Sequence, residues 1–411
     1  MKYVIIGNST AAVGCIEGIR SHDKDGEITV ISNENHHTYS RPLISYLLYG
    51  KTDTERMKYR GSDFYGKNKV KTILGENVVK IDAKNKCAVL ENGETEAYDK
   101  IMIATGSSPF VPPMKGLENV EKKFTFMTLD DAQNLEKVLT SDAKTVIIGA
   151  GLIGLKAAEG IADRVGKITV VDMADRILPS ILDEQGSAMI KKYLEDKKGI
   201  EFKLNTCVSE FDGNTAILAN GEKVDFDIVI IAVGVRPNTS LAKDAGAEVN
   251  RGIVCSSKQE TTLKDVYTAG DCCESFDISC GENRILALLP NAYMQGFTAG
   301  VNMSGGEAEF NNAIPMNAIG FFGNHIITAG SYIGESYTEI GDNTYKKLFF
   351  KDNLLKGFIL IGDIKRAGIY TSLIREQIPL DTIDFEAVKK QPGMYAFPKA
   401  RRDEKLRNGG I

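Results

Sequence analysis

Two stretches of the chain repeat nearly the same pattern of apolar, small and polar residues. Residues 4–18 read VIIGNSTAAVGCIEG, and residues 146–160 read VIIGAGLIGLKAAEG. In each stretch a short β-branched run predicts a buried strand, glycine predicts a turn, and Ala, Leu and Ile at helical spacing predict a helix. Such a strand–turn–helix unit places helix N–H groups where a pyrophosphate can bind. The chain therefore contains two candidate nucleotide-binding units.

The second unit has the more complete glycine pattern. Gly149, Gly151 and Gly154 follow the spacing Gly-x-Gly-x-x-Gly, and the next predicted strand, KITVVD, ends at Asp172. An acid at this place accepts hydrogen bonds from a ribose and repels the additional phosphate of NADPH. We therefore expect NADH, although Arg176 lies close enough in sequence to weaken that preference. The alternative is a glycine turn that binds no ligand.

The first unit departs from the glycine pattern. Gly7 is followed by Ser9 and Ala12 in the places of the second and third glycines. A second strand is predicted over residues 27–32 and ends near Glu34, where an acid again suits a ribose. On its own, this unit indicates a dinucleotide only weakly.

Changes in composition divide the rest of the chain. The segment SSPFVPPMKG, residues 107–116, contains three prolines and interrupts the regular pattern. The pattern changes again beyond Pro237, and TAGD, residues 268–271, follows another short predicted strand. From about Asn311 onward, alternating segments such as YKKLFF and KGFILIGD precede a helical stretch, TSLIREQI. This last region predicts a domain of α+β type.

Composition excludes several classes of function. The 411 residues, 43% hydrophobic and 26% charged, are typical of a globular protein with two or three domains. A net charge of -5 gives no general affinity for nucleic acid, and no apolar run reaches membrane-spanning length. The first predicted strand begins at Tyr3 and leaves no room for a signal peptide. We therefore expect a cytoplasmic protein without nucleic-acid or membrane partners.

The cysteines do not predict a metal site. Seven are scattered along the chain, and none forms a C-x-x-C pair. Cys272, Cys273 and Cys280 lie close in sequence but lack a fourth nearby ligand for an iron–sulfur cluster. We expect reduced thiols and no bound metal.

Five sequence pieces occur in a fixed order along most of the chain. They are GNSTAA, YDKIMIATGSSP, GAGLIG, IIAVGVRPN and VYTAGD. This ordered set resembles the two-dinucleotide flavoproteins of the glutathione-reductase-like family. The resemblance implies an α/β fold with two Rossmann-like domains, one for FAD and one for NAD(H), and a small C-terminal α+β domain. The implied boundaries are residues 1–110 with 240–311 for FAD, 111–239 for NAD(H), and 312–411 for the C-terminal interface domain.

The same resemblance assigns residues to each cofactor. The first glycine turn would border the FAD pyrophosphate, Glu34 its adenosine ribose, and Asp271 a ribityl hydroxyl. The segment LLPNAYMQG, residues 288–296, would point a helix N-terminus at the flavin, where the helix dipole favours negative charge. The residues implied for FAD are Gly7, Ser9, Ala12, Glu34, Arg41, Pro42, Val79, Thr105, Gly106, Asp271 and Leu289, and those implied for NAD(H) are Gly149, Gly151, Gly154, Asp172 and Gly234.

Three shorter sequence segments are most similar to three groups within the family. YSRPLISYLL, LIGLKAAEG and KLFFKDNLLKGFILIGD resemble NADH:rubredoxin reductases, the flavin half of nitrite reductase large subunits, and FAD/NAD oxidoreductases associated with carbon monoxide dehydrogenase. No cysteine lies between Cys15 and Cys87, where thiol-dependent relatives carry theirs. The resemblance therefore implies electron exchange between NADH, FAD and a ferredoxin-like or rubredoxin-like iron–sulfur protein. The alternatives are an NADH oxidase and a flavin-binding subunit of a larger redox complex.

Two positions differ from related ferredoxin reductases, which pair a lysine near flavin N5 with a glutamate on the NAD-side helix. Ser45 stands at the lysine position and Lys156 at the glutamate position, so both are candidate catalytic residues. We expect Lys156 to supply positive charge near the junction of flavin and nicotinamide, with Glu159 as a partner. The alternative is a solvent-exposed helix lysine.

The C-terminal tail is strongly basic. From Lys389 onward it contains seven Lys or Arg against two acids, and MYAFPKARR combines aromatic with basic residues. Such a segment suits docking of an acidic electron-transfer protein, and the alternative is a solvated terminus. The sequence leaves open whether the protein is a monomer or a homodimer.

Overall fold

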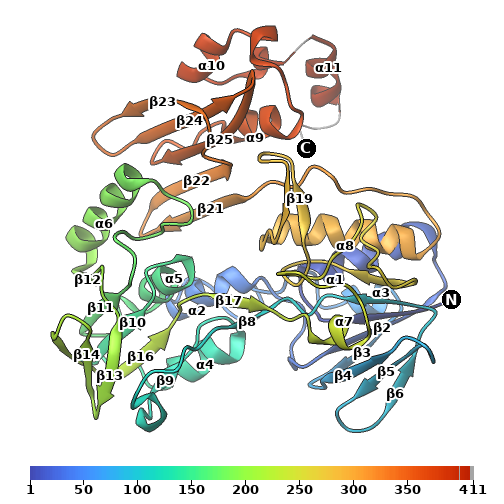
Figure 1. Cartoon of the computed structure of the whole chain (residues 1–411), viewed down its shortest axis with the longest axis horizontal. Helices are drawn as coiled ribbons and strands as arrows, with labels where there is room; N and C mark the ends of the chain where they lie inside the picture. Colours follow the sequence, from blue (N-terminus) through green and yellow to red (C-terminus); the bar gives the residue numbers. More distant parts are fainter. Residues whose placement is uncertain (398, 408–411) are drawn as a thin grey trace. The chain divides into compact units, whose positions relative to one another are not determined.

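Both predicted strand–turn–helix units are present in the structure, a computed structural model that describes residues 1–397 and 399–407 (Figure 1). The chain divides into two units. The first contains residues 1–275 and 287–310 and holds both glycine turns, and the second contains residues 276–286 and 311–411. Residues 276–286, which the predicted boundaries include in the FAD-binding domain, therefore lie with the C-terminal part of the chain.

The first sheet of the first unit is parallel, and its central strands are buried. Its order is β18-β7-β1-β2-β3, and helix α1 (Thr10–His22) follows β1 through the first glycine turn. Runs of Val and Ile suit strands that are covered on both faces. Because the strand order changes direction at β1, the carboxyl ends of the strands form a crevice there. The strands are β1 (Lys2–Ile6), β2 (Glu27–Ser32), β3 (Val70–Leu74), β7 (Lys100–Ile103) and β18 (Val266–Thr268).

Helix α8 (Leu289–Met303) lies parallel to α1 at a distance that only glycine allows. An added Cβ at Gly296 would lie 2.0 Å from the carbonyl oxygen of Ala11. This contact fixes the N-termini of both helices at the same end of the first sheet. At three further glycines an added Cβ would lie 2.2–2.3 Å from a carbonyl oxygen of the opposite helix, namely at Gly14, Gly18 and Gly300.

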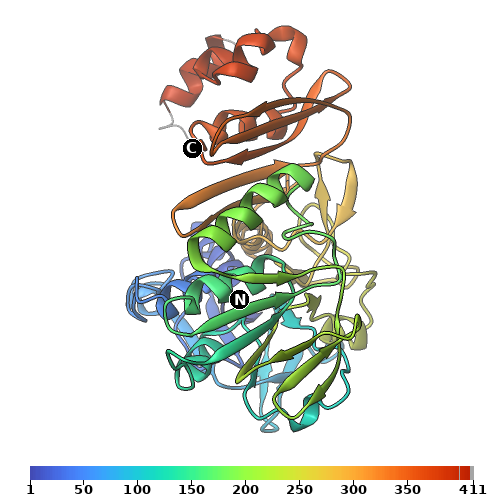
Figure 2. The same cartoon turned by 90° about the vertical axis from the view of Figure 1, so that its left-hand side faces the viewer.

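The second sheet of the first unit repeats the arrangement and faces the viewer in Figure 2. It is parallel, with the order β12-β11-β10-β16-β9, and α5 (Leu152–Ile161) follows β10 through the second glycine turn. Two more helices, α4 (Leu129–Glu136) and α6 (Glu184–Lys198), belong to this part of the chain. The strands are β9 (Lys123–Phe124), β10 (Lys144–Ile148), β11 (Lys167–Val171), β12 (Glu201–Lys203) and β16 (Ile228–Ile231).

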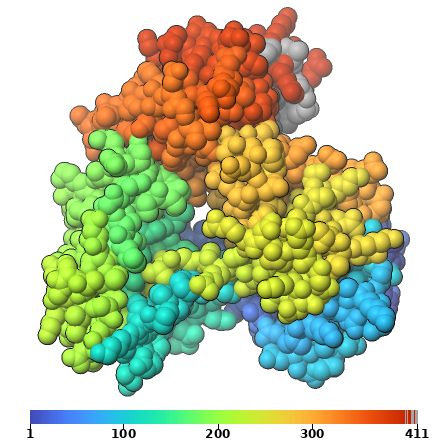
Figure 3. Space-filling model, in the orientation of Figure 1, coloured from blue at the N-terminus to red at the C-terminus, as the bar shows by residue number. Residues whose placement is uncertain are grey.

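Smaller elements complete the first unit. Two chain segments cross between the parallel sheets as an antiparallel pair, β8 (Ser107–Pro109) with β17 (Val235–Pro237). The space-filling view shows the first unit hollowed between its green and its yellow segments (Figure 3). One antiparallel sheet contains β4 (Val78–Asp82), β5 (Cys87–Leu90) and β6 (Thr95–Ala97). A second contains β13 (Val208–Asp212), β14 (Thr215–Leu218) and β15 (Lys223–Asp225). The short helices are α2 (Ile44–Leu48), α3 (Phe64–Lys67) and α7 (Ser240–Asp244).

The second unit is an antiparallel sheet with helices that pack on one face. Its order is β21-β22-β25-β24-β23, and apolar residues of β22, β24 and β25 form a core with α9 and α10. The elements are β19 (Ser275–Asp277), β20 (Glu282–Arg284), β21 (Met316–Phe321), β22 (Asn324–Gly330), β23 (Glu335–Ile340), β24 (Tyr345–Lys351), β25 (Leu354–Ile361), α9 (Ala367–Arg375), α10 (Phe385–Lys390) and α11 (Lys399–Arg407).

The predicted fold class is confirmed. Two parallel sheets, each with a glycine turn after its central strand, are accompanied by a smaller α+β unit. Within residues 1–397 and 399–407, no helix combines the length and the apolar character needed to cross a membrane.

Replacing Gly296 with Ala tests the contact between α1 and α8. The added methyl group would lie against the Ala11 carbonyl, so α8 must move and the free energy of unfolding in urea should fall by roughly 1–3 kcal/mol. Gly66→Ala is the matched control, because a Cβ at Gly66 meets no heavy atom of the described chain within 4 Å. Equal stability of the two variants would contradict the close packing.

Candidate functional site

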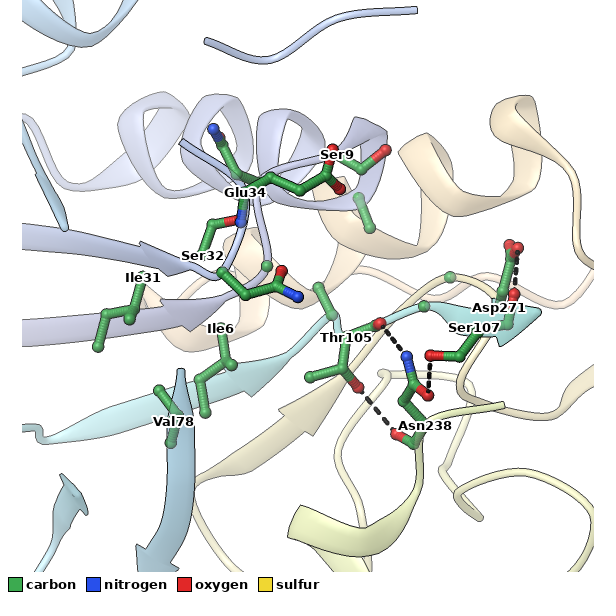
Figure 4. Close-up of a pocket in the computed structure, with 18 of the residues that line it drawn as sticks. Ile6, Ser9, Ile31, Ser32, Glu34, Val78, Thr105, Ser107, Asn238 and Asp271 are labelled. Carbon is green, nitrogen blue, oxygen red and sulfur yellow. Dashed lines mark hydrogen bonds between the residues drawn. The ribbon is translucent and has the colours of Figure 1, made fainter. Parts of the chain in front are cut away.

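A cavity of about 530 Å³ opens at the carboxyl ends of the strands in the first sheet (Figure 4). The first glycine turn, the residues after β2 and the loops after β7 and β18 border it. Its volume is in the range of sites for small-molecule cofactors. It is lined by nine of the residues predicted from sequence to contact FAD, namely Gly7, Ser9, Glu34, Arg41, Val79, Thr105, Gly106, Asp271 and Leu289.

The helices after both glycine turns begin without a side-chain cap, unlike α4 and α6 of the same unit. Neither α1 nor α5 has a side-chain cap or an acidic residue in its first turn. By contrast, Thr128 and Asp131 form a reciprocal capping box on α4, and Asp183 caps α6. An uncapped start leaves N–H donors and the positive end of the helix dipole available to an anion. Both starts therefore suit a phosphate group.

The two glycine turns have nearly the same geometry. Gly7 has a φ of 114° and Gly149 a φ of 113°, which favour glycine. An added Cβ would lie 2.1 Å from the Ala104 carbonyl oxygen at Gly7 and 2.3 Å from the Ala232 carbonyl oxygen at Gly149. At Gly151, however, a Cβ would meet no heavy atom of the described chain within 4 Å. The second turn is therefore open on the side where a ligand would approach.

Glu34 lies in a network at one side of the cavity. The Tyr39 hydroxyl donates to Glu34 Oε2 at 2.6 Å, and the Arg41 guanidinium forms an ion pair with Oε1. Tyr39 also accepts a hydrogen bond from the Leu129 N–H at 2.9 Å, which links the network to the start of α4. Burial raises the pKa of Tyr39 more than nearby Arg41 lowers it, so the hydroxyl keeps the proton that it donates.

Asp271 reaches the cavity from the loop after β18. The Ser107 hydroxyl donates to its carboxylate at 3.4 Å (Figure 4). Burial raises the pKa of Asp271, and the Ser107 hydrogen bond and the positive charge of Arg41 lower it only in part. A half-buried carboxylate with so little compensation suits a ligand that carries hydroxyl groups.

Asn238 holds the loop after β7 in place, and the sequence prediction omits it. Its side-chain amide donates to the Thr105 carbonyl at 2.9 Å, and the Thr105 hydroxyl donates to the Asn238 carbonyl at 2.8 Å (Figure 4). Asn238 belongs to the VRPN segment, but its hydrogen bonds join residues far apart in sequence.

Thr10 is a second cavity residue that the sequence prediction omits. Its hydroxyl is buried at the cavity and has no hydrogen-bond partner within the described residues.

The residues predicted for NAD(H) lie around the carboxyl edge of the second sheet. Strands β11, β10 and β16 are in parallel register, which brings the residues that follow them to one edge. Asp172 accepts hydrogen bonds from the N–H groups of Ala150, at 2.5 Å, and Ala174, at 2.7 Å. Arg176 forms an ion pair with the adjacent Asp175 at 2.8 Å. The set comprises Gly149, Gly151, Gly154, Asp172 and Gly234.

Two of the residues predicted for FAD, and the candidate catalytic residue Ser45, are absent from the cavity lining. Ala12 is fully buried in the core beneath α1, and Pro42 is exposed. Ser45 is buried, and its hydroxyl donates to the Pro42 carbonyl at 3.2 Å, a local hydrogen bond. Matching a motif position identifies the backbone location but not the direction in which the side chain points.

Lys156 does not extend into solvent. Its side chain is 17% exposed and forms an ion pair with Glu159, whose side chain is 6% exposed. The Lys156 ammonium lies 4.5 Å from the centre of the Tyr46 ring. Because Tyr46 belongs to α2, which follows the cavity residue Arg41 closely, Lys156 lies beside the segment that borders the cavity.

The described residues place no cysteine in the cavity lining. Cys15 is fully buried in α1, and Cys272 and Cys273, which follow Asp271 in the sequence, are buried too. Within the described residues there is also no cluster of three or more His, Cys, Asp or Glu side chains that could hold a metal ion.

Comparison with known families gives two matches. The model of the pyridine nucleotide-disulphide oxidoreductase family matches residues 1–296, and that of the rubredoxin NAD+ reductase C-terminal domain matches residues 315–378. The matched regions cover both parallel sheets and much of the C-terminal sheet.

Individual proteins are similar over most of the chain. The epsilon subunit of an NADH-dependent phenylglyoxylate dehydrogenase from Aromatoleum evansii is 31% identical over 92% of both chains. An NADH oxidase from Methanocaldococcus jannaschii is 34% identical over 75% of this chain and 71% of its own. The crystal structure of NADH:rubredoxin oxidoreductase from Clostridium acetobutylicum has a TM-score of 0.75, with 26% identity over 95% of this chain and 99% of its own.

Replacing Asp271 with Asn tests the cost of its buried charge. Because the folded protein raises the pKa of this carboxyl, the unfolded chain releases the proton more readily, and the charge opposes folding at neutral pH. At pH 7 we expect flavin-free Asp271→Asn to resist urea better than the unaltered protein, by on the order of 1 kcal/mol. This gain should shrink as the pH falls toward about 4, where the unfolded carboxyl is protonated too. An Asp271→Asn variant that is less stable than the unaltered protein at pH 7 would contradict the view that the charge of Asp271 opposes folding.

Proposed function

Because the chain belongs to the pyridine nucleotide-disulphide oxidoreductase family, we propose that it is an FAD-dependent enzyme that exchanges electrons between NADH and an iron–sulfur carrier of the ferredoxin or rubredoxin type. When bound, FAD accepts a hydride from NADH and can release the two electrons singly, which joins a two-electron donor to a one-electron carrier. The protein itself supplies binding, orientation and electrostatics.

The cavity of the first sheet fits FAD. The uncapped start of α1 and the hydroxyls of Ser9 and Thr10 would hold the pyrophosphate, and Glu34 would accept hydrogen bonds from the adenosine ribose. Asp271, a half-buried carboxylate with few donors, would accept hydrogen bonds from the ribityl hydroxyls. The start of α8 at Leu289 would direct its N–H groups and dipole toward the ring.

The single observation that carries the proposal is the absence of a thiol from the cavity lining within the described residues. Members of this family that reduce disulphides need a cysteine pair beside the flavin, and here Cys15, Cys272 and Cys273 are all buried outside the cavity lining. Electrons would therefore leave the flavin directly. The similarity to NADH:rubredoxin oxidoreductase supports an iron–sulfur acceptor, whereas the other two relatives favour an oxidase or a subunit of a larger complex.

NADH is the expected nucleotide at the second turn. The uncapped start of α5 and the open side of Gly151 would receive its pyrophosphate. Asp172 would accept hydrogen bonds from the ribose and repel a 2′-phosphate. Arg176, the residue that would favour NADPH, is paired with Asp175.

Lys156 is proposed to act on the flavin ring through its positive charge. Its ammonium lies on the Tyr46 ring, and the partner Glu159 is almost fully buried, so both charges are held in a medium of low dielectric constant. We assign it the role of favouring negative charge on the neighbouring cofactor. Ser45 would act only as a packing residue there, because its hydroxyl bonds to the Pro42 carbonyl.

The basic tail is proposed to dock an acidic carrier. Helix α11 carries Lys399, Arg401, Arg402 and Arg407. Lys389 lies in the last turn of α10 and is paired with Glu386 at 2.5 Å. The side chains of Glu404 and Lys405 lie outside the described residues. Charge complementarity of this kind raises association rates and depends on salt. Whether the protein is a monomer or a homodimer stays open.

An anaerobic survey of electron acceptors tests the proposed function. We expect NADH, but not NADPH at the same concentration, to bleach the flavin absorbance of the purified protein. Oxidised ferredoxin or rubredoxin should then restore the absorbance faster than air does, and deletion of residues 389–411 should reduce the salt dependence of that step. Faster recovery in air would identify an oxidase, and a flavin that NADH does not bleach would contradict the proposal.

Substitutions at Lys156 and Glu159 test the charge that the pair presents. Lys156→Met should lower the flavin midpoint potential by on the order of tens of millivolts, and Glu159→Gln should raise it, because the two changes alter local charge in opposite directions. Lys192→Met is the matched control, since Lys192 pairs with Asp196 within the exposed part of α6 at 2.7 Å. Shifts of the same sign at both positions would indicate a structural effect and contradict the charge role.

A further inference from the structure

One face of α5 lies against α2, the short helix next to the cavity. The residues of this face recur every fourth position, Lys156 and Gly160 within α5 and Arg164 three residues after its end, so they lie on one side of the chain. Lys156 meets the Tyr46 ring, and the other two residues meet the backbone of α2. We call this contact, made by Lys156, Gly160 and Arg164 with α2, the α5–α2 seam.

Gly160 sets how closely the two helices approach. An added Cβ would lie 3.0 Å from the Ser45 carbonyl oxygen and 3.3 Å from Leu48 Cβ. The first neighbour is backbone and the second is the fully buried Leu48, so neither can turn away. A methyl group at this position would therefore separate the helices by a few tenths of an ångström.

Arg164 holds the other end of the seam. Its guanidinium donates to the Leu48 carbonyl at 3.2 Å and pairs with Glu136 of α4 at 2.8 Å. Leu48 is the last residue of α2, and carbonyls in a final helical turn have no partner within the helix. The end of α2 is thus fixed to a residue that follows the nucleotide-binding helix.

Each helix of the seam leads directly to one half of the proposed reaction site. The segment before α2 contains Arg41, which lines the cavity, and α5 begins at Leu152, directly after Gly151 of the second glycine turn. The Ser45 carbonyl that faces Gly160 also accepts a hydrogen bond from the Tyr49 N–H at 3.0 Å. A displacement of this carbonyl would therefore weaken a hydrogen bond at the end of α2.

We propose that the α5–α2 seam sets the distance between nicotinamide and flavin, with Gly160 and Arg164 as positioning residues. This inference rests on the proposed function, because it requires both cofactors. Hydride transfer is steeply sensitive to the separation of the reacting atoms, and a displacement of 1 Å can slow a reaction about a hundredfold. A seam made of backbone, one glycine and one fixed guanidinium resists such displacement.

Gly160→Ala tests the inference on the flavin-loaded protein. Bleaching of the flavin by NADH, followed by stopped-flow absorbance, should slow about tenfold at saturating NADH. The NADH dissociation constant, the flavin content and the midpoint potential should stay unchanged, since the variant alters spacing and no charge. Hydrogen exchange, measured without NADH, should show faster exchange at the Tyr49 amide.

Gly368→Ala is the matched control, because Gly368 is also helical but a Cβ there meets no heavy atom of the described chain within 4 Å. Suppose that NADH bleaches the flavin of the unaltered protein, but Gly160→Ala matches Gly368→Ala in bleaching rate and in hydrogen exchange at Tyr49. That outcome would overturn the inference and leave the proposed function standing. Unaltered protein that NADH does not bleach would overturn the proposed function instead.

Arg164→Gln and Glu136→Gln separate the bond to α2 from the ion pair. Arg164→Gln should slow bleaching and speed exchange at Tyr49, whereas Glu136→Gln keeps the bond to the Leu48 carbonyl and should change both much less. Equal effects of the two variants would mean that the ion pair, not the bond to α2, matters, and would overturn the role given to Arg164.

Discussion

The close contact between α1 and α8 is the constraint on which the first unit depends. Glycines on both helices meet carbonyl oxygens of the opposite helix, so the helix axes approach more closely than side chains would permit. The parallel contact fixes two helix N-termini together, one after the first glycine turn and one at Leu289. Both N-termini border the cavity, and their N–H groups cannot move apart without breaking the core.

What the structure leaves unpaired indicates its chemistry as clearly as what it pairs. Helices α4 and α6 are capped by their own side chains, whereas α1 and α5 are not. The Thr10 hydroxyl and the Asp271 carboxylate are also poorly compensated at the same cavity. Each of these features has an energetic cost that a bound dinucleotide would lower.

The fold could be predicted largely from two patterns, the repeated strand–turn–helix unit and the ordered motifs. Backbone positions such as Gly7 and Gly149 were predictable, because their conformation restricts the residue type. Side-chain direction was not: Ala12 shares the motif but faces the core. Pairings across the chain, such as Asn238 with Thr105, depend on which loops the fold brings together. The partner of Lys156 could be proposed because helix spacing places Glu159 within reach.

The ion pair between Glu34 and Arg41 has a consequence for assembly of the holoprotein. Glu34 occupies the guanidinium that a diphosphate would otherwise neutralise, and it does so with the carboxylate that a ribose would otherwise engage. Binding of FAD at the proposed site would therefore be an exchange of partners. The free energy of binding would then be a difference between two sets of contacts, because Glu34 already serves as the counter-ion of Arg41 at the crevice.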